Sequence, residues 1–145
     1  MKSNLILAQN RFLFLSKNVS GHSDGITFID AKDDERHIIS NSKDQSIKLW
    51  DLRKFASNRS IEGTKEAVRN QTWDYRWDTG RRCPRRQIRI EDDPSIMTYR
   101  GHTVFKTLIR CRFSPSFSTG QKFIYTGCGT GAVKSKIFWN ALICL

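Results

Sequence analysis

The sequence lacks the features that place a protein in a membrane or send it out of the cell. None of its apolar runs approaches the roughly 18 residues that a membrane-spanning helix needs. Polar residues Gln9, Asn10 and Arg11 interrupt the short apolar stretch near the start, so we expect no secretory signal. We therefore expect a protein of the nucleus and cytoplasm that makes no contact with a membrane.

The sequence also lacks the closely spaced cysteine and histidine pairs that hold metal ions. A structural zinc site needs ligand pairs on short loops, because one tetrahedral ion must be gripped from several sides. No two cysteines here form a C-x-x-C pair, so we expect ordinary thiols, no bound metal and no cofactor. The residues concerned are Cys83, Cys111, Cys128 and Cys144, with His22, His37 and His102.

No group of residues has the pattern of a catalytic site. The glycine-rich segment 127–131 resembles a phosphate-binding loop only in composition. A phosphate-binding loop leads into a helix within a βαβ unit, whereas both flanks of this segment have the pattern of strands. We therefore expect no catalytic residue and predict that the chain is not an enzyme.

Positive charge is abundant and unevenly distributed. The 25 Lys and Arg residues outnumber 14 Asp and Glu residues, which gives a formal charge of +11. The densest cluster could be a nuclear import signal, a phosphate-binding patch or simply a solvated loop. Together with Trp73, Tyr75 and Trp77 it could also bind single-stranded nucleic acid by stacking. The cluster consists of Arg81, Arg82, Arg85, Arg86 and Arg89.

Short apolar segments separated by tight turns predict an all-β fold. Residues 46–51 alternate apolar and polar side chains, which is the period of a half-buried strand. Residues 64–69 have some helical character. The other predicted strands lie at 26–29, 37–40, 109–113 and 122–127.

The strand pattern occurs twice, which indicates a repeat architecture. A Gly-His pair opens each unit, at residues 21–22 and 101–102. The first unit ends in Trp50-Asp51, within the roughly 40–45 residues of a β-propeller blade.

These residues resemble the WD-repeat family, and the stretch from Ile38 to Asp51 carries most of the likeness. The resemblance implies a partial WD-repeat β-propeller of antiparallel strands with one full blade motif. It also implies that His22, Ser40, Asp44 and Trp50 form a hydrogen-bonded set within the blade, with Ser42 as the alternative hydroxyl. Buried polar groups of these types need partners, which such a network would supply.

The resemblance divides the chain into five parts. The second unit departs from the family pattern because Thr130 stands where the Asp of the hydrogen-bonded set is expected. Both termini lie outside the match, which predicts a truncated or alternatively spliced product. The parts are a non-matching segment 1–19, a WD repeat 20–54, a basic, aromatic-containing insert 55–96, an incomplete WD repeat 97–133 and a non-matching tail 134–145.

Within the family, residues 21–133 are similar to a substrate receptor of the cullin-4 RING ubiquitin ligases. Such receptors dock on the damaged-DNA-binding-protein adaptor through a Trp-Asp-x-Arg motif, which implies adaptor-binding roles for Trp50, Asp51 and Arg53. The resemblance implies a scaffold for protein ubiquitination whose protein substrate the sequence does not identify. The alternatives are a nucleic-acid-binding module that uses the Arg-rich insert, and a non-functional isoform.

Overall fold

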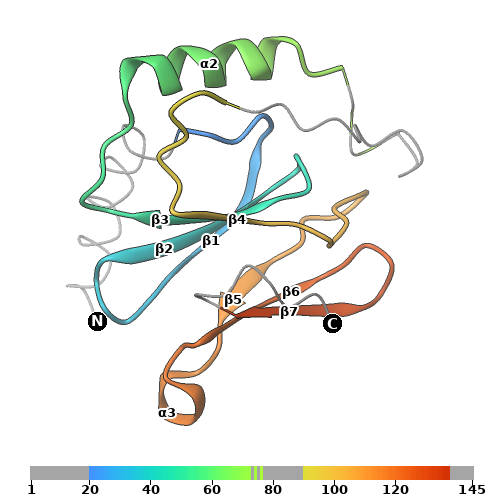
Figure 1. The fold of residues 1–145 in the computed structure, drawn as a ribbon. Coiled ribbons are helices and arrows are strands. Elements are labelled where there is room, and N and C mark those ends of the chain that lie inside the picture. The colour runs from blue at the N-terminus through green and yellow to red at the C-terminus, as the bar shows by residue number, and fades with distance from the viewer. Residues whose placement is uncertain (1–19, 73, 75, 77–89, 138–145) are drawn as a thin grey trace, which may run out of the picture.

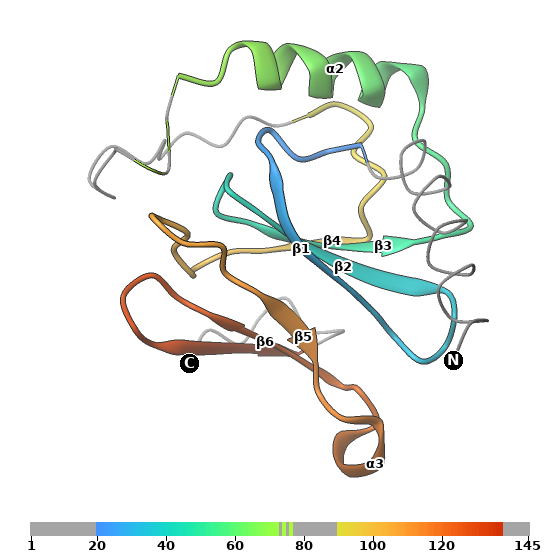
Figure 2. The same cartoon turned by 180° about the vertical axis from the view of Figure 1, so that it is seen from behind.

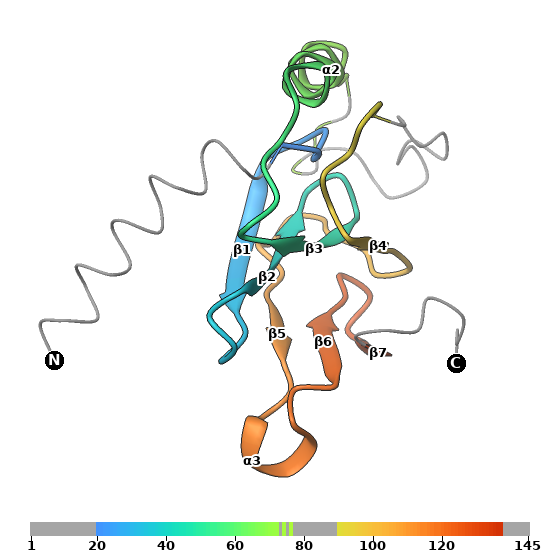
Figure 3. The same cartoon turned by 60° about the vertical axis from the view of Figure 1, so that its left-hand side comes forward.

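The chain folds into two antiparallel sheets that lie one above the other, with a helix beyond the first (Figures 1 and 3). This computed structural model describes residues 20–72, 74, 76 and 90–137. Within them the all-β, partial-propeller fold predicted from the sequence is confirmed. The strands are β1 (Ile26–Ala31), β2 (His37–Ser42), β3 (Ile47–Asp51), β4 (Met97–Tyr99), β5 (Cys111–Phe113), β6 (Phe123–Gly127) and β7 (Val133–Ile137).

The first sheet has the strand order β1-β2-β3-β4. Its first three strands form the meander predicted from the sequence, because the polar turns between them are short. The turn before β3 is closed by a hydrogen bond from the Gln45 amide to the Ser42 carbonyl, and Gln45 adopts a positive φ of 65° there. Strand β4 then pairs with the outer edge of β3, so the sheet ends with a strand from much later in the chain.

The prediction that 46–51 is a half-buried strand is wrong, because β3 is buried on both faces. Lys48, which the alternation placed on a solvent face, is only 4% exposed. Its ammonium group donates hydrogen bonds to Asp93 and to Thr98 Oγ1, the latter at 2.9 Å. The segment that leads into β4 therefore covers the face that the pattern assigned to water.

The second sheet has the order β5-β6-β7. Strand β7 pairs with β6 over the register Gly127↔Val133 to Phe123↔Ile137. Most of this strand falls in residues 134–137, which the sequence pattern left outside the second repeat. Two lysines in its five residues hide its strand character from an apolar pattern.

Two helices complete the described part of the chain. Helix α2 (Asn58–Arg69) begins at the N-cap Ser57, whose side chain accepts a hydrogen bond from the Ser60 amide. It lies beyond the first sheet, on the side away from the second, as Figures 1 and 2 show. The short helix α3 (Ser116–Thr119) lies at the opposite end of the molecule, between β5 and β6. No helix among the residues that the structure describes is long and apolar enough to cross a membrane.

One apolar core joins the two sheets. Burial of these side chains against each other supplies the main favourable free energy for stacking the sheets. Polar contacts add direction to the packing: Asp30 accepts a hydrogen bond from the Phe113 amide at 2.9 Å. The core consists of Ile39, Ile47, Leu49 and Tyr99 from the first sheet and Cys111, Phe113 and Ile124 from the second.

Candidate functional site: the first blade and its exposed end

The structure brings His22, Ser40, Asp44 and Trp50 together in one buried hydrogen-bonded set. His22 Nδ1 lies 2.8 Å from Asp44 Oδ2, and its Nε2 lies 2.7 Å from Ser40 Oγ. The Trp50 indole donates to the same Ser40 hydroxyl at 2.7 Å. Ser42 does not take part, because its hydroxyl donates to the Asp24 carbonyl. The set ties the loop before β1 to β2, the β2–β3 turn and β3.

Asp44 is the centre of this set because it accepts hydrogen bonds from several elements at once. Ser46 donates to Oδ1 through its amide and its hydroxyl, and the Ser23 amide donates to Oδ2. Burial on its own raises the pKa of a carboxyl group. The hydrogen bonds from His22, Ser46 and Ser23 outweigh burial and lower the pKa of Asp44 to about 2.

We expect the free energy of unfolding to fall as the pH drops from about 4 to about 2. The pKa of Asp44 is about 2 in the folded chain against an ordinary 3.8, so the unfolded chain takes up this proton first. The stabilisation, about 2 kcal/mol, is fully present above pH 5 and is lost on acidification. Urea unfolding at a series of pH values measures it. Ser46→Ala should make the loss smaller, and an unchanged pH dependence in that variant would contradict this assignment.

Two further residues support the set, and the sequence pattern did not single them out. Gly21 adopts a φ of +149°, and a Cβ there would lie 2.7 Å from Asp93 Oδ1 and 3.1 Å from the Trp50 ring. Asp93 pairs in turn with Lys48, whose ammonium group lies 5.9 Å from the Trp50 ring centroid. The glycine of the first Gly-His pair is therefore required by close packing against Asp93 and Trp50. Residue 93 is remote in sequence, so no local spacing marks it.

In the second unit the equivalent histidine has a different partner. His102 Nε2 lies 2.7 Å from Asn41 Oδ1 on β2, and Asn41 Nδ2 donates to the Ile109 carbonyl at 2.9 Å. Burial lowers the pKa of His102 to about 4, so the ring is neutral at physiological pH. Thr130, which replaces the expected Asp, donates to Cys128 Sγ at 3.1 Å. His102 thus links the second unit to the first sheet.

The exposed end of the blade is formed by the turn that follows β3. Trp50 is only 2% exposed, so its side chain serves the blade and not a partner. Asp51 Oδ2 accepts two hydrogen bonds from the Arg36 guanidinium, at 2.6 and 3.0 Å, and its Oδ1 accepts one from the Arg53 amide. The pKa of Asp51 is lowered to about 2, chiefly by the hydrogen bond from Arg36. Arg53 itself is exposed beside this turn.

The second Trp-Asp-x-Arg segment, residues 73–76, differs from the first in the use of its carboxylate. Asp74 accepts hydrogen bonds from the side chain of Arg76 at 2.9 to 3.2 Å. The guanidinium of Arg53 has no such carboxylate partner among the residues that the structure describes. The predicted basic patch of Arg81, Arg82, Arg85, Arg86 and Arg89 lies outside the described residues.

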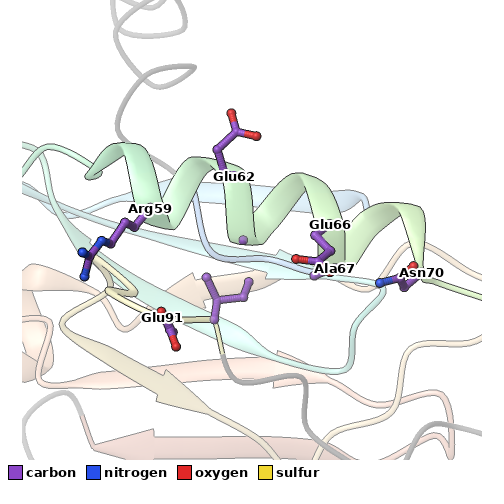
Figure 4. A pocket seen from close by; sticks show the side chains of 8 residues that line it. Arg59, Glu62, Glu66, Ala67, Asn70 and Glu91 are labelled. Atoms are coloured by element: carbon purple, nitrogen blue, oxygen red, sulfur yellow. The ribbon is translucent and has the colours of Figure 1, made fainter.

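A groove of about 720 Å³ lies beneath α2 (Figure 4). Its floor is apolar, through Ile90 and Ala67, and Arg59 and Glu91 lie along its margin, while Glu62 points away from it. In the described part of the chain, no three His, Cys, Asp or Glu side chains lie close enough to hold a metal ion. The arrangement of the described residues suits contact with another protein more than chemistry on a small molecule.

A family model described as "WD domain, G-beta repeat" matches residues 14–51. The match ends at Asp51, where β3 ends, and includes His22, Ser40, Asp44 and Trp50. The chain belongs to the WD-repeat family. This confirms the resemblance read from the Gly-His and Trp-Asp pairs.

Curated relatives narrow the likeness within the WD-repeat family. A "DDB1- and CUL4-associated factor 11 homolog" of Caenorhabditis elegans is 50% identical over 114 residues, which is 79% of this chain and 19% of the relative. Its namesake in Caenorhabditis briggsae is 49% identical over 114 residues, 79% of this chain and 20% of the relative. A "LEC14B protein" of Lithospermum erythrorhizon is 55% identical over 109 residues, 74% of this chain and 22% of the relative. The chain thus spans about a fifth of the length of these relatives.

Proposed function

We propose that this WD-repeat chain is a protein-interaction scaffold that associates with the damaged-DNA-binding-protein adaptor of cullin-4 ubiquitin ligases. The observation that carries the proposal is the end of the first blade, where Arg53 is exposed beside a turn fixed by Asp51. Two relatives about 50% identical to the chain bear names that state association with DDB1 and CUL4, which supports this choice of partner.

An arginine suits this role for a physical reason. Its planar guanidinium group can donate several hydrogen bonds in a fixed geometry to carboxylates or carbonyls of a partner. Asp51 is already engaged by Arg36, so it holds the Arg53 backbone and does not neutralise the Arg53 side chain. The guanidinium therefore remains available to a partner.

The role we infer for the scaffold is that of a substrate receptor, which holds a protein close to the ligase. Such a receptor raises the effective concentration of its substrate, and the other subunits transfer ubiquitin. It needs no catalytic residue of its own.

We expect Arg53→Ala to weaken adaptor binding about tenfold or more, because an arginine at the centre of an interface commonly contributes that much. Co-precipitation of the adaptor with the tagged chain, followed by a titration, measures the loss. Arg69→Ala, which removes an exposed arginine from α2, is the matched control and should bind normally. Equal binding by the unsubstituted chain and Arg53→Ala would count against Arg53, and no binding by the unsubstituted chain would count against the partner.

A further inference from the structure

Residues 52–57, which connect β3 to α2, are held at both ends. At the start, the Lys54 amide donates to the Asp51 carbonyl at 3.0 Å and the Arg53 amide donates to Asp51 Oδ1 at 2.9 Å. At the other end, Ser57 Oγ accepts a hydrogen bond from the Ser60 amide at 3.1 Å and caps α2. A connection held in this way loses little conformational entropy when it binds a partner.

Phe55 lies between these two anchors and is 64% exposed. A phenyl ring that moves from water into an apolar pocket gains free energy from the whole area it buries. Phe117 is more exposed, at 92%, but it lies on α3 at the opposite end of the molecule. Among the exposed large apolar side chains, Phe55 therefore stands out because it is two residues from Arg53.

The connection is also positively charged. Residues 52–61 contain Arg53, Lys54 and Arg59 and no acidic residue. All three side chains are exposed. The nearest carboxylate at the start of the connection, Asp51, is paired with Arg36. A surface of this kind attracts an acidic partner and repels a basic one.

We propose that Phe55 is the aromatic anchor of the adaptor-binding edge and that Arg53 is its charged neighbour, so that together they fit an acidic protein surface with an apolar pocket. This inference rests on the proposed function and deepens it. Phe55 supplies affinity through burial, whereas the surrounding cations steer and orient the approach. Interfaces commonly concentrate their binding energy in such an aromatic residue beside an arginine.

The test is a titration of the purified adaptor with the 145-residue chain, by biolayer interferometry, at low and at moderate salt. Phe55→Ala should raise Kd about 30-fold. The salt dependence should stay close to that of the unsubstituted chain, because the cations remain. Phe117→Ala is the matched control and should change Kd less than twofold. Circular dichroism of each variant checks that the exposed substitution leaves the fold intact.

The outcomes separate this inference from the proposed function. If Arg53→Ala weakens binding and Phe55→Ala does not, the anchor role is wrong and the adaptor association stands. If Phe55→Ala and Phe117→Ala weaken binding equally, the effect is not specific to this edge and the anchor role is again wrong. If the unsubstituted chain does not bind the adaptor at all, both proposals fail.

Discussion

Replacement of Asp44 by alanine should lower the free energy of unfolding by about 3 kcal/mol, which is much of the stability of a small domain. The carboxylate accepts hydrogen bonds from the Ser46 hydroxyl and from the Ser46 and Ser23 amides, and it pairs with His22. Removing it leaves several buried donors without an acceptor, and each such loss costs more than the hydrogen bond itself contributed. Urea unfolding followed by tryptophan fluorescence measures the change.

Asp33→Asn is the control for this substitution. Asp33 lies in the exposed turn between β1 and β2 and should tolerate the change within about 0.5 kcal/mol. If Asp44→Ala and Asp33→Asn had equal stabilities, Asp44 would not organise the blade. Ser42→Ala separates the two candidate hydroxyls: it should leave the His22 set intact, whereas Ser40→Ala should break it.

Asn41→Leu should release the second sheet from the first at a cost of about 2 kcal/mol. The leucine keeps a similar volume but cannot bond His102 or the Ile109 carbonyl, so both are left buried without their partner. Native-state amide exchange should show faster opening of β5 and β6 with smaller changes in β2 and β3. This pattern follows because the lost bonds cross between the sheets and do not lie within either one.

Thr27→Val is a milder variant at the same interface. Thr27 Oγ1 also bonds the Ile109 carbonyl, at 3.0 Å, so its loss should shift exchange in the same direction by a smaller amount. Equal acceleration in both sheets for Asn41→Leu would show that the substitution destabilises the whole chain, and would contradict the linking role of Asn41.

The strands that the sequence predicts are those with a local signal. Strands β1, β2, β3 and β6 have apolar runs or alternation bounded by polar turns, and these patterns act over a few residues. Strand β4 has only three residues and follows a long insert, so its pairing with β3 leaves no periodic trace. Strand β7 carries two lysines and was missed because it lies at the edge of its sheet.

The same division applies to the candidate site. The set formed by His22, Ser40, Asp44 and Trp50 could be expected from the WD-repeat resemblance, because its members keep a family spacing. The pairing of Lys48 with Asp93 and the contact of Asn41 with His102 could not. Each joins residues 45 or more positions apart, and no local pattern in one sequence encodes such a distance.

The most direct test of this account is native-state amide exchange of the unsubstituted chain, followed peptide by peptide. The account predicts the slowest exchange in residues 37–51, where the buried strands and the Asp44 turn coincide, at a free energy close to that of global unfolding. Exchange in this segment as fast as in an unstructured peptide would contradict a blade held together by these side chains.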